Sequence, residues 1–126
     1  MSAPSESHDG VVLVTIDDPD QGRAIAQTLI EQQLAACVNL YPIRSIYRWQ
    51  GKICDEAEWQ LVIKTDLRHF AALEAQIRAI HPYDVPEIIA LPIIEGAQPY
   101  LQWLRAQVKP CPATYSADSA AAESSS

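Results

Sequence analysis

The sequence of 126 residues lacks the features that mark membrane and secreted proteins. No apolar run approaches the roughly 18 residues that a membrane-spanning helix needs, so we expect no membrane association. Residues 1–22 contain no Lys or Arg, and their only apolar run, Val11–Ile16, is six residues long. This pattern does not resemble a signal peptide, and we expect a cytoplasmic protein.

Basic residues and glycines are also scarce. There are 9 Lys and Arg against 16 Asp and Glu, and the basic residues are scattered, which does not indicate nucleic-acid binding. The 4 glycines form neither a GxGxxG motif nor a phosphate loop, and no nucleophile elbow is present. We therefore predict a protein that is not an enzyme and needs no obligatory cofactor. Hydrolase chemistry through His81 and Glu87 is kept as an alternative.

The cysteines and two of the histidines point to no specific site. Cys37, Cys54 and Cys111 are widely spaced and form no CxxC or zinc-finger pattern. Reduced thiols in a cytoplasmic protein are the simplest interpretation. We expect His8 and His69 to lie at the surface.

The two ends of the chain differ from its middle. Residues 110–126 are rich in Ala and Ser, with Tyr115 as the one large apolar side chain, and residues 1–9 are polar. Such segments bury too little surface to offset their ordering entropy. We predict disordered ends, residues 1–9 and 110–126, around one domain of residues 10–109.

Hydrophobic periodicity within that domain predicts alternating strands and helices. We expect strands over 11–16, 37–49, 58–65 and 88–94, and helices over 19–34, 66–80 and 96–108. Asp18 and Pro19 are typical of a helix start, and Gln50 and Gly51 indicate a hairpin turn. This order predicts an α+β fold, a ferredoxin-like split βαβ arrangement with an extra C-terminal helix and an antiparallel sheet.

The first and last strands are apolar on both faces, although the two main helices of such a fold cover one face only. No other segment is left to cover the second face. An exposed apolar face of this size indicates self-association, so the pattern predicts a homo-oligomer.

Residues 81–87 are the most unusual local sequence. The segment His81-Pro82-Tyr83-Asp84-Val85-Pro86-Glu87 combines an imidazole, a phenol and two carboxylates at a junction between helix and strand. Rigid loops on a scaffold often carry binding groups, but a stiff connector explains the composition equally well.

Several motifs together resemble the CutA family of divalent-cation tolerance proteins. They are LAACVN at 34–39, SIYRWQGK at 45–52, and HPYxxPE at 81–87, and the resemblance runs from about Val11 to Val108. It implies a ferredoxin-like, PII-like homotrimer packed sheet to sheet. It also implies a role in tolerance of copper and other divalent metals.

The resemblance raises direct copper binding or buffering as an alternative function, with copper or another divalent cation as ligand. Family members with proposed copper ligands carry a cysteine in the first strand and paired histidines before Pro-Tyr. This sequence has Val14 and Ile80 there, so only His81 is left as a metal candidate. One imidazole does not make a metal site.

PII-like trimers bind ligands in clefts between subunits, which implies a regulator that binds a small molecule or a protein partner. The residues that match the family pattern and suit such a cleft are Trp49, Lys64, His81, Tyr83 and Glu87. Packing of the aromatic residues at a trimer interface is the competing interpretation. Because burying an unpaired ammonium costs several kcal/mol, we predict that Lys64 pairs with Glu87 or that both contact the ligand.

Overall fold

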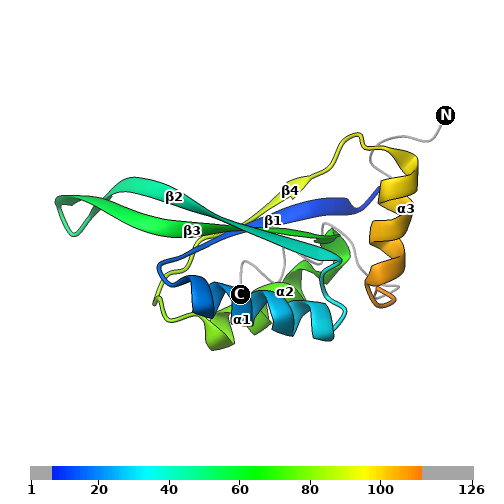
Figure 1. Ribbon diagram of the computed structural model, residues 1–126, viewed down its shortest axis with the longest axis horizontal. Coiled ribbons are helices and arrows are strands. Elements are labelled where there is room, and N and C mark those ends of the chain that lie inside the picture. The colour runs from blue at the N-terminus through cyan, green and yellow to red at the C-terminus, as the bar shows by residue number, and fades with distance from the viewer. Residues whose placement is uncertain (1–6, 112–126) are drawn as a thin grey trace.

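The computed structural model describes residues 7–111 and has the predicted α+β fold. Its elements are β1 (Asp9–Ile16), α1 (Pro19–Glu31), β2 (Cys37–Trp49), β3 (Lys52–Asp66), the 3-10 helix η2 (Leu67–His69), α2 (Phe70–Ile80), β4 (Ile88–Pro92) and α3 (Gln98–Gln107). The four strands form one sheet in the order β2-β3-β1-β4, and every neighbouring pair is antiparallel (Figure 1).

The predicted disordered ends lie mostly outside the described residues. Where the two overlap, Asp9 already belongs to β1 and is buried. No helix within residues 7–111 is both long and apolar enough to cross a bilayer.

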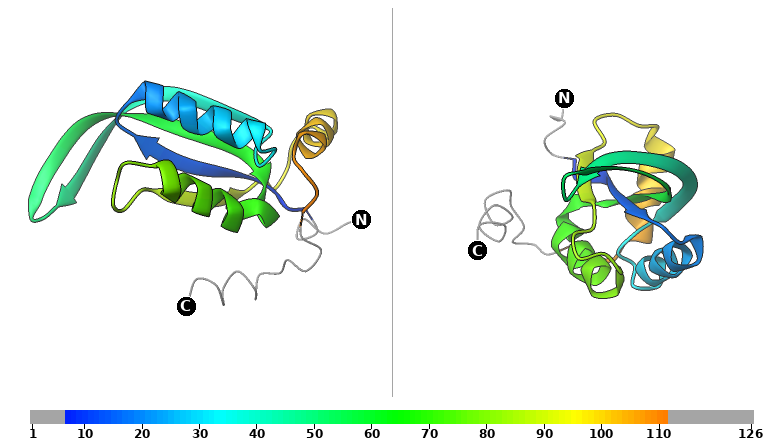
Figure 2. Two further views of the ribbon diagram at one scale, coloured as in Figure 1. Left: turned by 90° about the horizontal axis from the view of Figure 1, so that it is seen from below. Right: turned by 90° about the vertical axis from the view of Figure 1, so that its left-hand side faces the viewer.

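Helices α1 and α2 lie side by side on one face of the sheet (Figure 2). The start of α1 is as predicted: the side chain of Asp18 accepts a hydrogen bond of 2.9 Å from the amide of Asp20, and Pro19 is the first helical residue. The core between helices and sheet consists of Val12, Val14, Ile16, Ile25, Leu29, Leu34, Ala35, Leu61, Ile63, Leu73 and Ile77.

The hairpin of β2 and β3 is longer than predicted. Its strands pair from Cys37 opposite Lys64 to Trp49 opposite Lys52, whereas β1 reaches only to Trp59 of β3. Residues 43–58 therefore extend beyond the sheet as a two-stranded arm (Figure 1). Pro42 does not interrupt β2, because β2 is an edge strand.

The face of the sheet opposite α1 and α2, here called the bare face, carries the apolar side chains Val11, Leu13, Val62, Ile89 and Leu91. Side chains alternate between the faces of a strand, and the buried Val12 and Val14 point to the helices. Ile89 and Leu91 are 47% and 44% exposed. The predicted uncovered apolar face is therefore present in the single chain.

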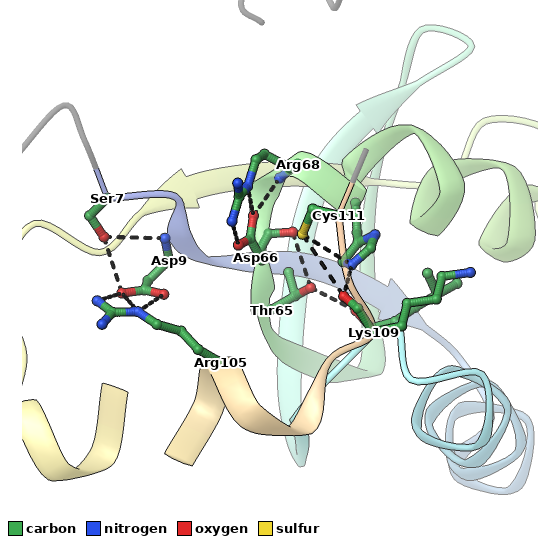
Figure 3. A network of polar contacts seen from close by, with 10 residues as sticks. Ser7, Asp9, Thr65, Asp66, Arg68, Arg105, Lys109 and Cys111 are labelled. Carbon is green, nitrogen blue, oxygen red and sulfur yellow. Dashed lines mark hydrogen bonds and ion pairs between the residues drawn. The ribbon is translucent and has the colours of Figure 1, made fainter. Parts of the chain in front are cut away.

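Helix α3 lies at the end of the sheet away from the arm (Figure 1), where an ion pair with a buried carboxylate holds it. Arg105 Nη2 lies 2.6 Å from Oδ2 of Asp9, and Asp9 also accepts a hydrogen bond from the Ser7 hydroxyl (Figure 3). The chain after α3 is fastened by His69, whose Nε2 lies 2.8 Å from the carbonyl oxygen of Lys109. His69 is only 3% exposed, so its predicted surface position is wrong.

Candidate functional site

A cavity of about 610 Å³ lies where the arm, the end of β1 and the loop between α2 and β4 meet. We call it the acidic cavity. It is lined by Thr15, Asp17, Ser45, Ile46, Tyr47, Trp49, Glu56, Glu58, Tyr83, Asp84, Val85 and Glu87. By the alternation of β1, Thr15 is on the same side of the sheet as the bare face, so the cavity adjoins that face.

Tyr83 is the aromatic residue that the loop between α2 and β4 contributes to the acidic cavity. Its hydroxyl donates a hydrogen bond of 2.8 Å to Oε2 of Glu58, and the Glu58 side chain is almost fully buried. Burial and the adjacent Glu58 carboxylate raise the pKa of Tyr83, which keeps its hydroxyl protonated as a donor.

His81 lies behind Tyr83 and is 8% exposed. Its Nε2 lies 2.8 Å from the carbonyl oxygen of Thr15, and its Nδ1 accepts a hydrogen bond of 3.1 Å from the amide of Tyr83. Both ring nitrogens are thus engaged within the chain, and neither offers a free lone pair to a metal ion. Among residues 7–111, no group of three or more His, Cys, Asp and Glu side chains is placed to hold a metal.

The charge around the acidic cavity has one sign. Its lining includes the five carboxylates Asp17, Glu56, Glu58, Asp84 and Glu87, and no Lys or Arg. Partial burial and the charge of Glu58 raise the pKa of Glu87. The hydroxyl of Tyr47 donates to Glu56 at 3.0 Å, and that bond, together with partial desolvation and the nearby negative charges, raises the pKa of Tyr47 to about 12. Such a lining favours a ligand with a positive charge or hydrogen-bond donors.

The predicted site residues are only partly brought together. Trp49, Tyr83 and Glu87 line the acidic cavity, and His81 supports Tyr83 from behind. Lys64 does not belong to the cavity, because the register places it opposite Val11, at the other end of β1.

Lys64 and Glu87 therefore do not pair within one chain. Glu87 precedes Ile88, which pairs with Val14, whereas Lys64 pairs with Val11 three residues earlier on β1. The ammonium of Lys64 lies over the ring of Tyr100, 5.5 Å from its centre. A contact between Lys64 and Glu87 of different subunits stays a prediction.

Sequence reasoning missed Glu58 and Tyr47. Glu58 alternates with apolar neighbours as an ordinary solvated glutamate of a strand does, and no local pattern distinguishes a solvated glutamate from a buried one. Its hydrogen-bond partner Tyr83 is 25 residues away in the chain.

The sequence of the chain is similar to those of known proteins. The family model described as "CutA1 divalent ion tolerance protein" matches residues 10–107. The divalent-cation tolerance protein CutA of Thermus thermophilus is 50% identical over 96 residues, which are 75% of this chain and 93% of that protein. A chloroplastic CutA of Arabidopsis thaliana is 44% identical over 96 residues, which cover 75% of this chain but only 53% of the relative.

Solved structures of similar proteins share the fold. The structure of the Thermus thermophilus protein has a TM-score of 0.77 and 47% identity, and the match covers 80% of this chain and 99% of that one. A protein from Nostoc, described as PII-like, has a TM-score of 0.73 and 32% identity over 79% of this chain and 97% of that chain in its apo form. The arrangement of strands and helices is therefore the one these proteins adopt.

Proposed function

The chain belongs to the CutA1 divalent ion tolerance family, and we propose that it is a trimeric, cytoplasmic regulator that binds a small ligand and is not an enzyme. In this proposal the acidic cavity forms part of a cleft between subunits. The observation that carries it is the acidic cavity itself, which has the size of a small-molecule site and adjoins the bare face.

Assembly through the bare face explains why its apolar side chains lie exposed in one chain. Ile89→Lys places a charge on that face, next to Leu13, and is expected to dissociate the oligomer in analytical ultracentrifugation. Ile30→Lys is the matched control, because Ile30 is 42% exposed on α1, away from the bare face. A wild-type chain that sediments as a monomer at micromolar concentration refutes the trimer.

The lining predicts the class of ligand. Three aromatic rings, those of Tyr47, Trp49 and Tyr83, stand among the carboxylates, and aromatic faces attract cations. We therefore expect a small organic cation or a molecule rich in amino groups.

Capture of metabolites on the immobilised protein, followed by mass spectrometry, tests this ligand class. Trp49→Ala should abolish the enrichment, because Trp49 is 52% exposed and lines the cavity. Trp103→Ala is the control, since Trp103 is 44% exposed on α3, outside the cavity. Enrichment of no metabolite, or equal enrichment on both variants, contradicts a ligand in the acidic cavity.

Direct copper binding is the competing function, and the geometry of His81 counts against it, since a metal would have to displace one of two hydrogen bonds. Calorimetric titration of copper into the reduced wild type and into His81→Ala separates the two. Submicromolar binding that is lost in the variant would favour the copper function. The same geometry disfavours a hydrolase, because His81 has no free nitrogen to act as a base with Glu87.

A further inference from the structure

Three contacts fix Tyr83 at the edge of the acidic cavity. Its amide donates to Nδ1 of His81 at 3.1 Å, its ring meets the His81 ring edge-on with centroids 4.7 Å apart, and its hydroxyl donates to Glu58 at 2.8 Å. Two of these contacts come from the imidazole of His81. His81 itself caps the C-terminal end of α2, where its backbone amide donates a hydrogen bond to the carbonyl oxygen of Ile77.

The partners of the imidazole define which nitrogen carries the proton. A backbone carbonyl only accepts hydrogen bonds, so Nε2, 2.8 Å from the Thr15 oxygen, must be the protonated nitrogen. A backbone amide only donates, so Nδ1, which accepts from the Tyr83 amide, must be the unprotonated nitrogen. His81 thus links the end of β1 to the loop between α2 and β4 through one neutral tautomer.

Tyr83 also lines two cavities. One is the acidic cavity, and the other is a cavity of about 670 Å³ lined by Asp17, Asp18, Pro19, Gln21, Pro82 and Tyr83. Besides Tyr83, only Asp17 lines both. The position of the Tyr83 ring therefore helps to set the shape of the acidic cavity.

We propose that His81 is a positioning residue, whose bare Nδ1 holds the Tyr83 amide so that the Tyr83 ring walls the acidic cavity and its hydroxyl reaches Glu58. The placement of Tyr83 stands on the contacts above, and its consequence for a ligand rests on the proposed function. Without Nδ1 as acceptor, the loop between α2 and β4 is no longer linked to β1 through the His81 ring. The Tyr83 ring that walls the acidic cavity is then no longer held in place.

Two substitutions of the same residue separate the acceptor from the bulk of the ring. In His81→Asn the amide oxygen occupies the position of Nδ1, so it accepts from Tyr83 but no longer reaches Thr15. In His81→Gln the amide group lies one bond farther out, near the position of Nε2, so it donates to Thr15 and leaves the Tyr83 amide without an acceptor. Both variants lose the aromatic contact equally.

Hydrogen exchange of the Tyr83 amide, followed by NMR on the full chain, distinguishes them. We expect exchange close to the wild-type rate in His81→Asn and about tenfold faster exchange in His81→Gln, since a donor that lost its partner opens more readily. His69→Gln is the control: His69 is also buried and bonds a carbonyl, but it lies in η2 and should leave Tyr83 unchanged. Equal exchange in the Asn and Gln variants overturns the proposal.

A measurement on the wild type keeps the proposal testable if neither variant folds. The ring nitrogens of His81 should show a protonated Nε2 and an unprotonated Nδ1 in ¹⁵N spectra, and the opposite tautomer overturns the proposal. Metabolite capture on His81→Gln adds the ligand readout and should fall relative to His81→Asn. If the wild type captures no metabolite while the exchange result holds, the proposed function fails and the positioning role stands.

Discussion

Removing the guanidinium of Arg105 should destabilise the protein far more than its exposed position suggests. The side chain of Asp9 is 2% exposed and accepts from Nε and Nη2 of Arg105 at 2.6 to 3.2 Å, whereas Arg105 itself is 44% exposed. Arg105→Met keeps the length and packing of the stem. It leaves the Asp9 carboxylate buried without its charged partner, while the hydrogen bond from the Ser7 hydroxyl remains.

The size of the expected destabilisation follows from the difference in burial between Asp9 and Arg105. Breaking a buried ion pair by removing one partner costs about 3 to 5 kcal/mol, and an ordinary surface pair is worth less than about 1 kcal/mol. Because the guanidinium is half in water, we expect the lower end, about 3 kcal/mol in the free energy of unfolding. The double variant Asp9→Asn/Arg105→Met removes the buried charge as well and should recover about 1 to 2 kcal/mol of that loss.

Guanidinium-induced unfolding, followed by circular dichroism at one fixed chain concentration, measures these differences. Arg23→Met is the control, because Arg23 pairs with Asp20 between two exposed side chains and should change the free energy by less than about 0.5 kcal/mol. The reasoning is refuted if Arg105→Met costs no more than Arg23→Met, or if the double variant is no more stable than Arg105→Met.

Three further predictions concern charge and packing. Burial alone would raise the pKa of Asp66, but hydrogen bonds from Arg68 outweigh it and lower that pKa. The protein should therefore lose stability on acidification below the usual aspartate pKa of about 3.9, and Asp66→Asn should reduce this loss. Glu58→Gln should lower the pKa of Tyr83 toward its ordinary value in ¹³C NMR titration, because a charged acceptor is replaced by a neutral one. Gly10→Ala should cost about 1 to 3 kcal/mol of unfolding free energy, since the added methyl would overlap a packed leucine side chain.

Each of these has an outcome that contradicts it. An acid unfolding profile that is the same for Asp66→Asn and the wild type removes the role of the Arg68 contacts. An unchanged Tyr83 titration in Glu58→Gln means that burial alone determines the tyrosine pKa. A melting temperature of Gly10→Ala within error of the wild type shows that the leucine side chain moves aside at no cost.

Local physical rules let the sequence determine the order and type of the elements. Asp18 and Pro19 start α1 because a carboxylate accepts the free amides of a first turn and proline needs no donor there. The first and last strands are apolar on both faces, and this pattern predicted the bare face. The type of an amino acid alone determines that its apolar side chain is unfavourable in water. The family motifs, including HPYxxPE, could also be recognised from the sequence alone.

The tertiary structure alone decided which of the candidate residues meet. Strand register separates Lys64 from Glu87 along β1, and register depends on pairing between segments far apart in the chain. Glu58 accepts its hydrogen bond from Tyr83, which lies in a loop 25 residues later. His69 is buried, and its ring meets the carbonyl oxygen of Lys109, 40 residues later in the chain. A polar residue shows from sequence only what it can bind, and the partner it binds is fixed by long-range packing.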